Sequence, residues 1–184
     1  MEFSYCYPSD STSIFGLSQH AGKVFVLDMS ASWWAPCYVS IPEGEELYEH
    51  WSDDDRVEII HFLDDLNQPY SCNVWGEVGS IDIPPIVDDG TNNTIFEWFN
   101  NPGGLRIYPL IIFIDHTLKI VYIDNLLPSY ENSNFIIEAM LNAIPVDIEG
   151  CIDESACNYN SAATMDDGSC LENDCSGVCG GSAV

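Results

Sequence analysis

Four short apolar segments constrain the fold of this chain more than any other feature of its sequence. They cover residues 23–29, 57–63, 107–115 and 118–123, and each is typical of a strand. Helix-like sequence separates the first two, whereas a tight turn joins the last two into a predicted hairpin. Strands that alternate with helices favour a central sheet covered by helices. The sequence therefore predicts an α/β domain with a mixed sheet.

The helices of this domain are predicted from proline positions, capping residues and apolar spacing. Pro36 suits the first turn of a helix that runs from about residue 37 to 51, with its glutamates on the solvent side. Ser133 is the expected N-cap of a last helix over residues 134–143. Two shorter helices are expected near residues 71–76 and 94–100.

The character of the sequence changes after Pro145, where hydrophobic periodicity stops. Five of the eight cysteines fall in the last 34 residues: Cys151, Cys157, Cys170, Cys175 and Cys179. This density is typical of secreted modules held together by disulfides. We expect a domain over residues 1–147, with its core at about 15–144, and a disulfide-stapled module over residues 148–184. Local pairing must leave at least one of these cysteines over, and three short-range pairs are open alternatives: Cys151–Cys157, Cys157–Cys170 and Cys175–Cys179.

Charge and composition exclude several classes of partner. The net charge is −26 with only four basic residues, which argues against nucleic acid and anionic membranes. No apolar run is long enough to span a bilayer, and no motif for a metal or cofactor occurs, so none of these is expected. The first residues lack the basic and apolar opening of a signal peptide. The cysteines nevertheless indicate an extracytoplasmic or secreted protein, of which this chain is expected to be a piece. The oligomeric state is left open.

The loop SASWWAPC at residues 30–37 carries a family resemblance together with the segment GLSQHAGK at residues 16–23, which leads into an apolar strand, and with Tyr108–Pro109. Residues 31–37 match the pattern A-x-W-C-x-P-C at every defined position except one, where Trp34 replaces the first cysteine. Tyr108–Pro109 precedes the predicted hairpin, as a cis-proline does in the same family. In this order, the motifs resemble the thioredoxin family and especially its extracytoplasmic relatives. The resemblance implies a thioredoxin-like fold over about residues 15–144 and a cis bond at Pro109.

The tail resembles short cysteine repeats of secreted multidomain proteins of marine bacteria. Residues 150–170 look like one unit, and residues 174–181 look like the start of another. The chain is therefore expected to be cut off within an array of such repeats.

The thioredoxin resemblance implies roles for three residues. Trp34 takes the position of the nucleophilic cysteine and Cys37 that of the resolving cysteine. An indole cannot attack a disulfide, so the ordinary dithiol cycle is expected to be absent. Asp28 matches the buried acid that moves protons for the resolving cysteine. Its alternative interpretation is a strand residue that reaches water or a backbone N–H.

Three functions remain open at this stage. The first is a redox-impaired binding or structural module, in which an extended peptide lies in a groove between the Trp34 loop and Pro109. This groove would be formed by Trp33, Trp34, Ala35, Pro36, Tyr108 and Pro109, with the aromatic residues as its platform. The second is an active thiol-disulfide oxidoreductase that pairs Cys37 with Cys72, or whose true residue 34 is cysteine or selenocysteine. Cys6 is a further candidate partner for Cys37. The third is a purely architectural segment.

Overall fold

The computed structural model describes residues 3–8, 14–16, 21–64, 69–79, 84–89, 94–100 and 105–183 of the chain. It divides into two compact units, Met1–Ile144 and Pro145–Val184. Each unit is described by itself below.

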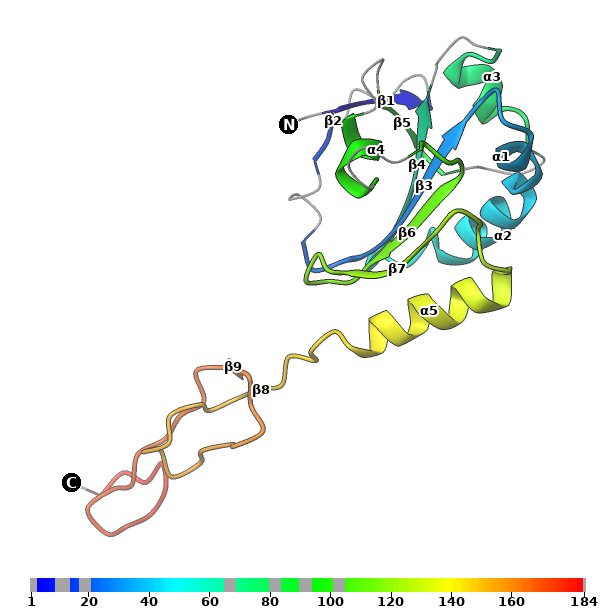
Figure 1. Cartoon of the computed structure of the whole chain (residues 1–184). Coiled ribbons are helices and arrows are strands. Elements are labelled where there is room, and N and C mark those ends of the chain that lie inside the picture. Colours follow the sequence, from blue (N-terminus) through cyan, green and yellow to red (C-terminus); the bar gives the residue numbers. More distant parts are fainter. Residues whose placement is uncertain are drawn as a thin grey trace. The chain divides into compact units, whose positions relative to one another are not determined.

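Within its described residues, the first unit contains one mixed sheet of seven strands in the order β2-β1-β5-β4-β3-β6-β7. Strand β3 lies inside this sheet, next to the central strand β4, and is parallel to β4 and antiparallel to β6. The predicted mixed sheet is therefore confirmed (Figure 1). The strands span β1 Phe3–Tyr7, β2 Ile14–Phe15, β3 Val24–Ala31, β4 Val57–Asp64, β5 Ile86–Asp88, β6 Leu110–Ile114 and β7 Ile120–Asp124.

The sheet is covered on both faces, which explains why its central strands are apolar on both sides. Alternate residues of β3 enter different cores, because successive side chains of a strand point to opposite faces. Phe25 packs in the core that contains Phe96 of α4 (Thr94–Phe99). Val26 packs in the core that contains Leu47 of α2 and Ile137 of α5. Helix α4 therefore lies on one face of the sheet, and α2 and α5 lie on the other (Figure 1).

The predicted helix over residues 37–51 is two helices. Helix α1 covers Ala35–Val39 and α2 covers Ile41–Trp51, with Ser40 between them. Pro42 supplies the reason, because it lacks an N–H and its ring clashes with the carbonyl four residues earlier in a continuous helix.

The remaining helices and strands are of the predicted type, but some begin or end at other residues than predicted. The two short helices are confirmed as α3 (Cys72–Gly76) and α4, and the hairpin is confirmed as β6 and β7. Helix α5 spans Tyr130–Asn142 and begins one turn before the predicted cap. Ser133 is therefore a buried residue inside the helix, where its hydroxyl donates to the carbonyl of Pro128 at 3.2 Å.

In the second unit, β8 (Glu149–Gly150) and β9 (Met165–Asp166) form a small parallel pair. This pairing places Cys151 beside Cys170, and these two form a disulfide with a Cα–Cα distance of 4.7 Å. A second disulfide joins Cys157 to Cys179, and Cys175 is free and exposed. Local pairing with one cysteine left over is confirmed. The three short-range alternatives are wrong, because the two disulfides join cysteines that are 19 and 22 residues apart in the sequence.

No helix among the described residues has both the length and the apolar character needed to cross a bilayer.

A disulfide between Cys6 and Cys72 joins β1 to the start of α3. The two elements also pack closely at Gly76, where a Cβ atom would overlap the ring of Tyr7. The bridge closes a loop of 66 residues in sequence separation. It therefore restricts the unfolded chain strongly and fastens the edge of the sheet to α3.

Replacing both cysteines of this bridge, as Cys6→Ser with Cys72→Ser, should lower the free energy of unfolding by about 4 kcal/mol, because the unfolded chain regains loop entropy. Urea unfolding followed by tryptophan fluorescence measures this, since all five tryptophans lie in the first unit. The matched control is Cys175→Ser, which removes a free exposed thiol and should leave the midpoint unchanged. An unchanged midpoint in the double variant would show that the bridge does not stabilise the domain.

Candidate functional site

The loop that follows β3 turns directly into α1 and exposes two tryptophans. Trp34 is the N-cap of α1, and its N–H donates to the Ala31 carbonyl at 3.1 Å. Trp33 and Trp34 are 49% and 44% exposed, and their rings meet edge to face at 5.8 Å. Ala35 and Pro36 are exposed as well. The position at the helix N-terminus thus presents an indole to solvent.

The sulfur of Cys37 lies on the inner side of the same helix. This side chain is 0% exposed and free of any disulfide. Burial raises the pKa of the Cys37 thiol to about 12, and the negative charge of Asp28 acts in the same direction. A backbone N–H from Ala31 at 3.5 Å opposes this shift without cancelling it. Cys37 is therefore a protonated, inaccessible thiol at neutral pH.

The alternative in which Cys37 pairs with Cys72 or Cys6 is wrong. These two cysteines pair with each other instead, at a Cα–Cα distance of 6.0 Å. The reason is the register of β1, which lies antiparallel to β5 and carries Cys6 to the start of α3. Strand β1 was not predicted from the sequence, so this partner for Cys72 was not foreseen.

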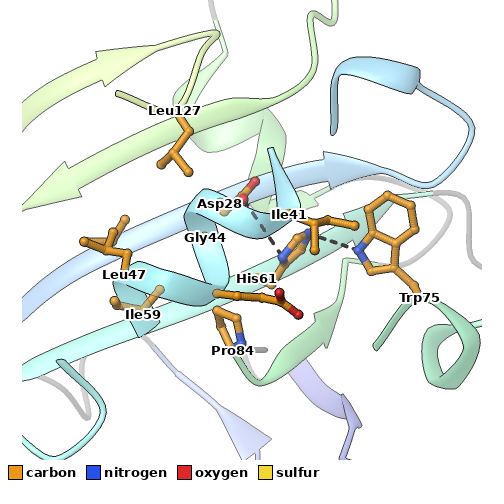
Figure 2. A pocket seen from close by; sticks show the side chains of 11 residues that line it. Asp28, Ile41, Gly44, Leu47, Ile59, His61, Trp75, Pro84 and Leu127 are labelled. Carbon is orange, nitrogen blue, oxygen red and sulfur yellow. Dashed lines mark hydrogen bonds and ion pairs between the residues drawn. The ribbon is translucent and has the colours of Figure 1, made fainter. Parts of the chain in front are cut away.

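Asp28 is buried and belongs to a polar chain that crosses two strands. Its carboxylate accepts a hydrogen bond from the Ser30 hydroxyl at 2.8 Å and faces His61 Nδ1 at 4.0 Å. Trp75 Nε1 donates to His61 Nε2 at 3.4 Å. An indole N–H only donates, so Nε2 must accept and the ring proton lies on Nδ1, toward Asp28. Figure 2 shows His61 between Asp28 and Trp75.

Burial lowers the pKa of His61, and the charge of Asp28 opposes this shift. Its burial and its bond to Trp75 make His61 a core histidine with a hydrogen-bond partner.

A small cavity lies beside this polar chain (Figure 2). Its volume is about 20 Å³, enough for one water molecule. Asp28, Glu45 and His61 contribute its polar groups, and the rest of the lining is mostly apolar. Among the described residues, no group of three histidine, cysteine, aspartate or glutamate side chains is placed to hold a metal ion.

The segment around Pro109 lies next to the tryptophan loop. The Tyr108–Pro109 peptide bond is cis, as predicted. The ring of Tyr108 contacts Trp33 edge to face at 6.1 Å and packs against Phe96 at 4.6 Å. Its hydroxyl donates to Asp64 Oδ2 at 2.9 Å. The side-chain amide of Asn125 donates to the Pro109 carbonyl and thereby tethers this segment to the strand hairpin.

Tyr108 and Pro109 are not part of an exposed platform, which corrects the sequence-based expectation. Tyr108 is only 4% exposed, and Pro109 is buried. Phe96 and the bond to Asp64 hold the phenol beneath Trp33, so it supports the surface instead of forming it.

The exposed apolar residues nearest the loop are Trp33, Trp34, Tyr38 and Val39, which we call the aromatic surface. Tyr38 was not predicted as a site residue, although its spacing of four from Trp34 places both on one side of a helix. A hollow of about 490 Å³ includes in its lining Phe96, which packs against Tyr108. It is lined by Phe96, Phe99, Asn100, Leu105, Ile107, Leu110, Ile123, Asp124 and Asn125.

Alkylation with iodoacetamide should distinguish the two free thiols. In the native protein one cysteine, Cys175, should react within minutes, because Cys37 is buried and protonated. Unfolding in guanidinium should add a second carbamidomethyl group per chain, measured by intact mass. The variant Cys175→Ser should show no fast labelling. Fast labelling of Cys37 in the native state would contradict the burial of this sulfur.

Several solved structures have a fold similar to that of this chain. No family model and no curated protein matches the chain. A putative protein disulfide isomerase from Bacteroides thetaiotaomicron is 21% identical with a TM-score of 0.62, over 77% of this chain and 86% of that one. An exposed lipoprotein thioredoxin from Streptococcus pneumoniae is 22% identical with a TM-score of 0.57, over 76% and 98%. A thiol:disulfide interchange protein from Chlorobium tepidum is 19% identical with a TM-score of 0.58, over 70% and 87%.

Identities this low establish the architecture only. Together with the strand order around β3 and the loop before α1, they show that this chain has a thioredoxin-like fold.

Proposed function

We propose that this thioredoxin-like domain binds an extended polypeptide segment at the aromatic surface and does not exchange disulfides. The observation that carries the proposal is the exposed indole of Trp34 at the N-cap of α1, with the sulfur of Cys37 buried behind it. The thioredoxin-like frame positions residue 34 for contact with a partner, and this residue has no thiol.

Thiol chemistry is the first half of the argument. Disulfide exchange begins with attack by an accessible thiolate. The N-terminus of a helix favours a thiolate, but here that position holds Trp34. The pKa of Cys37 is raised to about 12, so its thiolate is scarce at neutral pH, and burial blocks its approach to a partner. Without a mixed disulfide for Cys37 to resolve, Asp28 has no proton to move in that step, and its carboxylate accepts a hydrogen bond from Ser30.

The aromatic surface itself supports the binding of a peptide. Tryptophan and tyrosine bury large areas on binding and lose few rotamers, so exposed aromatic residues favour recognition. Trp33 contacts Tyr108, and Tyr108 packs against Phe96. Phe96 in turn lines the hollow. An extended chain could lay one apolar side chain on the tryptophans and place another in the hollow. This geometry supports a peptide more than a compact small molecule, because the two features are separate and open.

The disulfides support an extracytoplasmic location for this function. Three bridges persist most readily in an oxidising compartment. We propose further that residues 148–184 form a separate stapled module, of the kind that occurs as a repeat in secreted proteins.

Insulin reduction by dithiothreitol, followed as turbidity, tests the thiol half of the proposal. The protein should not accelerate the reaction, because its loop has no accessible thiolate. Trp34→Cys should accelerate it by about 10-fold or more, since it places a thiol at the helix N-terminus opposite Cys37. Trp34→Ser is the matched control and should stay inactive. Catalysis by the unmodified protein would overturn the proposal and favour an oxidoreductase.

Peptide affinity tests the binding half. Trp34→Ala should weaken binding of an extended apolar peptide by about 30-fold, as expected for a central aromatic contact. Phe135→Ala provides the control, because Phe135 is an exposed aromatic side chain on α5, outside the aromatic surface. Calorimetric titration gives both affinities. Equal losses in the two variants, or none in either, would remove the aromatic surface as the binding site.

A further inference from the structure

This chain has few positive charges, and most of them form ion pairs. Its four basic residues all lie in the described part of the chain, and three of them form ion pairs. The pairs are Lys23 with Glu58 at 2.8 Å, Arg56 with Asp54 at 2.7 Å and Arg106 with Glu97 at 2.7 Å. With a net charge of −26, the surface repels an acidic partner and attracts a basic one.

The fold also places carboxylates beside the aromatic surface. Asp64 ends β4 in register with Ala31, two residues before Trp33. Asp88 ends β5 in register with Leu63, so both acids lie at the carboxyl ends of parallel strands. Asp64 is also connected to Trp33 through Tyr108, whose hydroxyl donates to its carboxylate and whose ring contacts the indole.

A third carboxylate reports on the charge at this edge of the sheet. Asp89 is buried, and its two oxygens accept the N–H groups of Ile95 and Phe96. Burial raises the pKa of Asp89, and the negative charges of Asp64 and Asp88 add to this effect. Arg106 faces the same edge but is bonded to Glu97 and offsets only part of the charge. The end of the sheet beside Trp33 is therefore electronegative.

We infer that the extended segment bound at the aromatic surface is cationic and carries a lysine or arginine side chain next to Trp33. This inference rests on the proposed peptide-binding function and names the chemistry of the partner. An exposed indole face attracts a cation through its ring quadrupole, and arginine in particular packs flat on tryptophan. The carboxylates of Asp64 and Asp88, at the carboxyl ends of β4 and β5, add an attraction for a cation at this edge of the sheet. Long-range attraction by the acidic chain increases the association rate.

Three peptides that differ at a single central residue test the inference. Each is an extended apolar decapeptide, with lysine, glutamine or glutamate at its centre. At 50 mM salt, the lysine peptide should bind about 10-fold more tightly than the glutamine peptide, and the glutamate peptide more weakly than either. At 500 mM salt the differences should shrink to about twofold, because screening removes the charge contribution.

Variants separate a local preference from general attraction to an acidic protein. Asp64→Asn keeps a side-chain oxygen that can accept the Tyr108 hydroxyl, and it should weaken binding of the lysine peptide more than binding of the glutamine peptide. Asp88→Asn provides an independent second variant if Asp64→Asn unfolds. Glu138→Gln on α5 is the matched control, since it removes one negative charge from an exposed position elsewhere, and it should keep the preference.

The outcomes separate this inference from the proposal on which it rests. Equal affinity for the lysine and glutamine peptides would overturn the cationic partner but leave peptide binding in place. A lysine preference that persists in Trp33→Ala would also overturn it, because the preference would then be unspecific. Failure of all three peptides to bind would overturn the proposed function itself.

Discussion

The double pairing of β3 is the constraint on which the rest of the first unit depends. All eight residues of β3 are buried, with β4 parallel on one side and β6 antiparallel on the other. Its backbone groups are therefore satisfied within the sheet, and its side chains enter both cores. The same strand holds Asp28 and Ser30 and ends at Ala31, where the tryptophan loop begins. The position of the loop follows directly from the position of β3.

This arrangement separates two properties that coexist in an active thiol-disulfide enzyme. The buried side of the loop keeps a thiol, an acid and a serine hydroxyl in contact, at Cys37, Asp28 and Ser30. The exposed side has two indoles and no sulfur. The buried groups are satisfied by one another and do not reach a partner. The proposed role of the exposed side is recognition, and the proposed preference for a cationic partner follows from the acidic residues at the ends of β4 and β5.

Much of the fold could be predicted from the sequence, because β3, β4, β6 and β7 are apolar runs long enough to show a pattern. Strands β2 and β5 have two and three residues, and only their neighbours in the sheet define them. Without β1, the partner of Cys72 could not be found, since that disulfide depends on a contact between distant segments. The break before Pro42 was visible in principle, because a proline at the second residue of α2 marks the first turn of a helix.

The sequence indicated the tryptophan loop and Pro109, but it indicated neither Tyr38 nor the exposure of the aromatic side chains. Motif spacing indicated Trp34, Cys37 and Pro109 together, and the cis bond at Pro109 agrees with this. The spacing of motifs in the sequence does not indicate which aromatic side chains are exposed to solvent. Tyr108 is buried because its ring packs against Phe96 and its hydroxyl donates to Asp64. Both partners belong to other elements of the fold, so the local sequence does not show these contacts. Tyr38 takes its place on the exposed side because α1 presents it there.

The indole N–H signals of the five tryptophans provide the most direct test of the central claim, that the exposed loop is a binding surface. Trp51 and Trp75 have their indole N–H groups bonded to Asn134 and His61 inside the domain. In nitrogen-15 nuclear magnetic resonance spectra, adding the lysine decapeptide should shift the Trp33 and Trp34 signals and leave those of Trp51 and Trp75 in place. Shifts confined to other tryptophans, or saturation of the peptide without any shift at Trp33 and Trp34, would contradict the account.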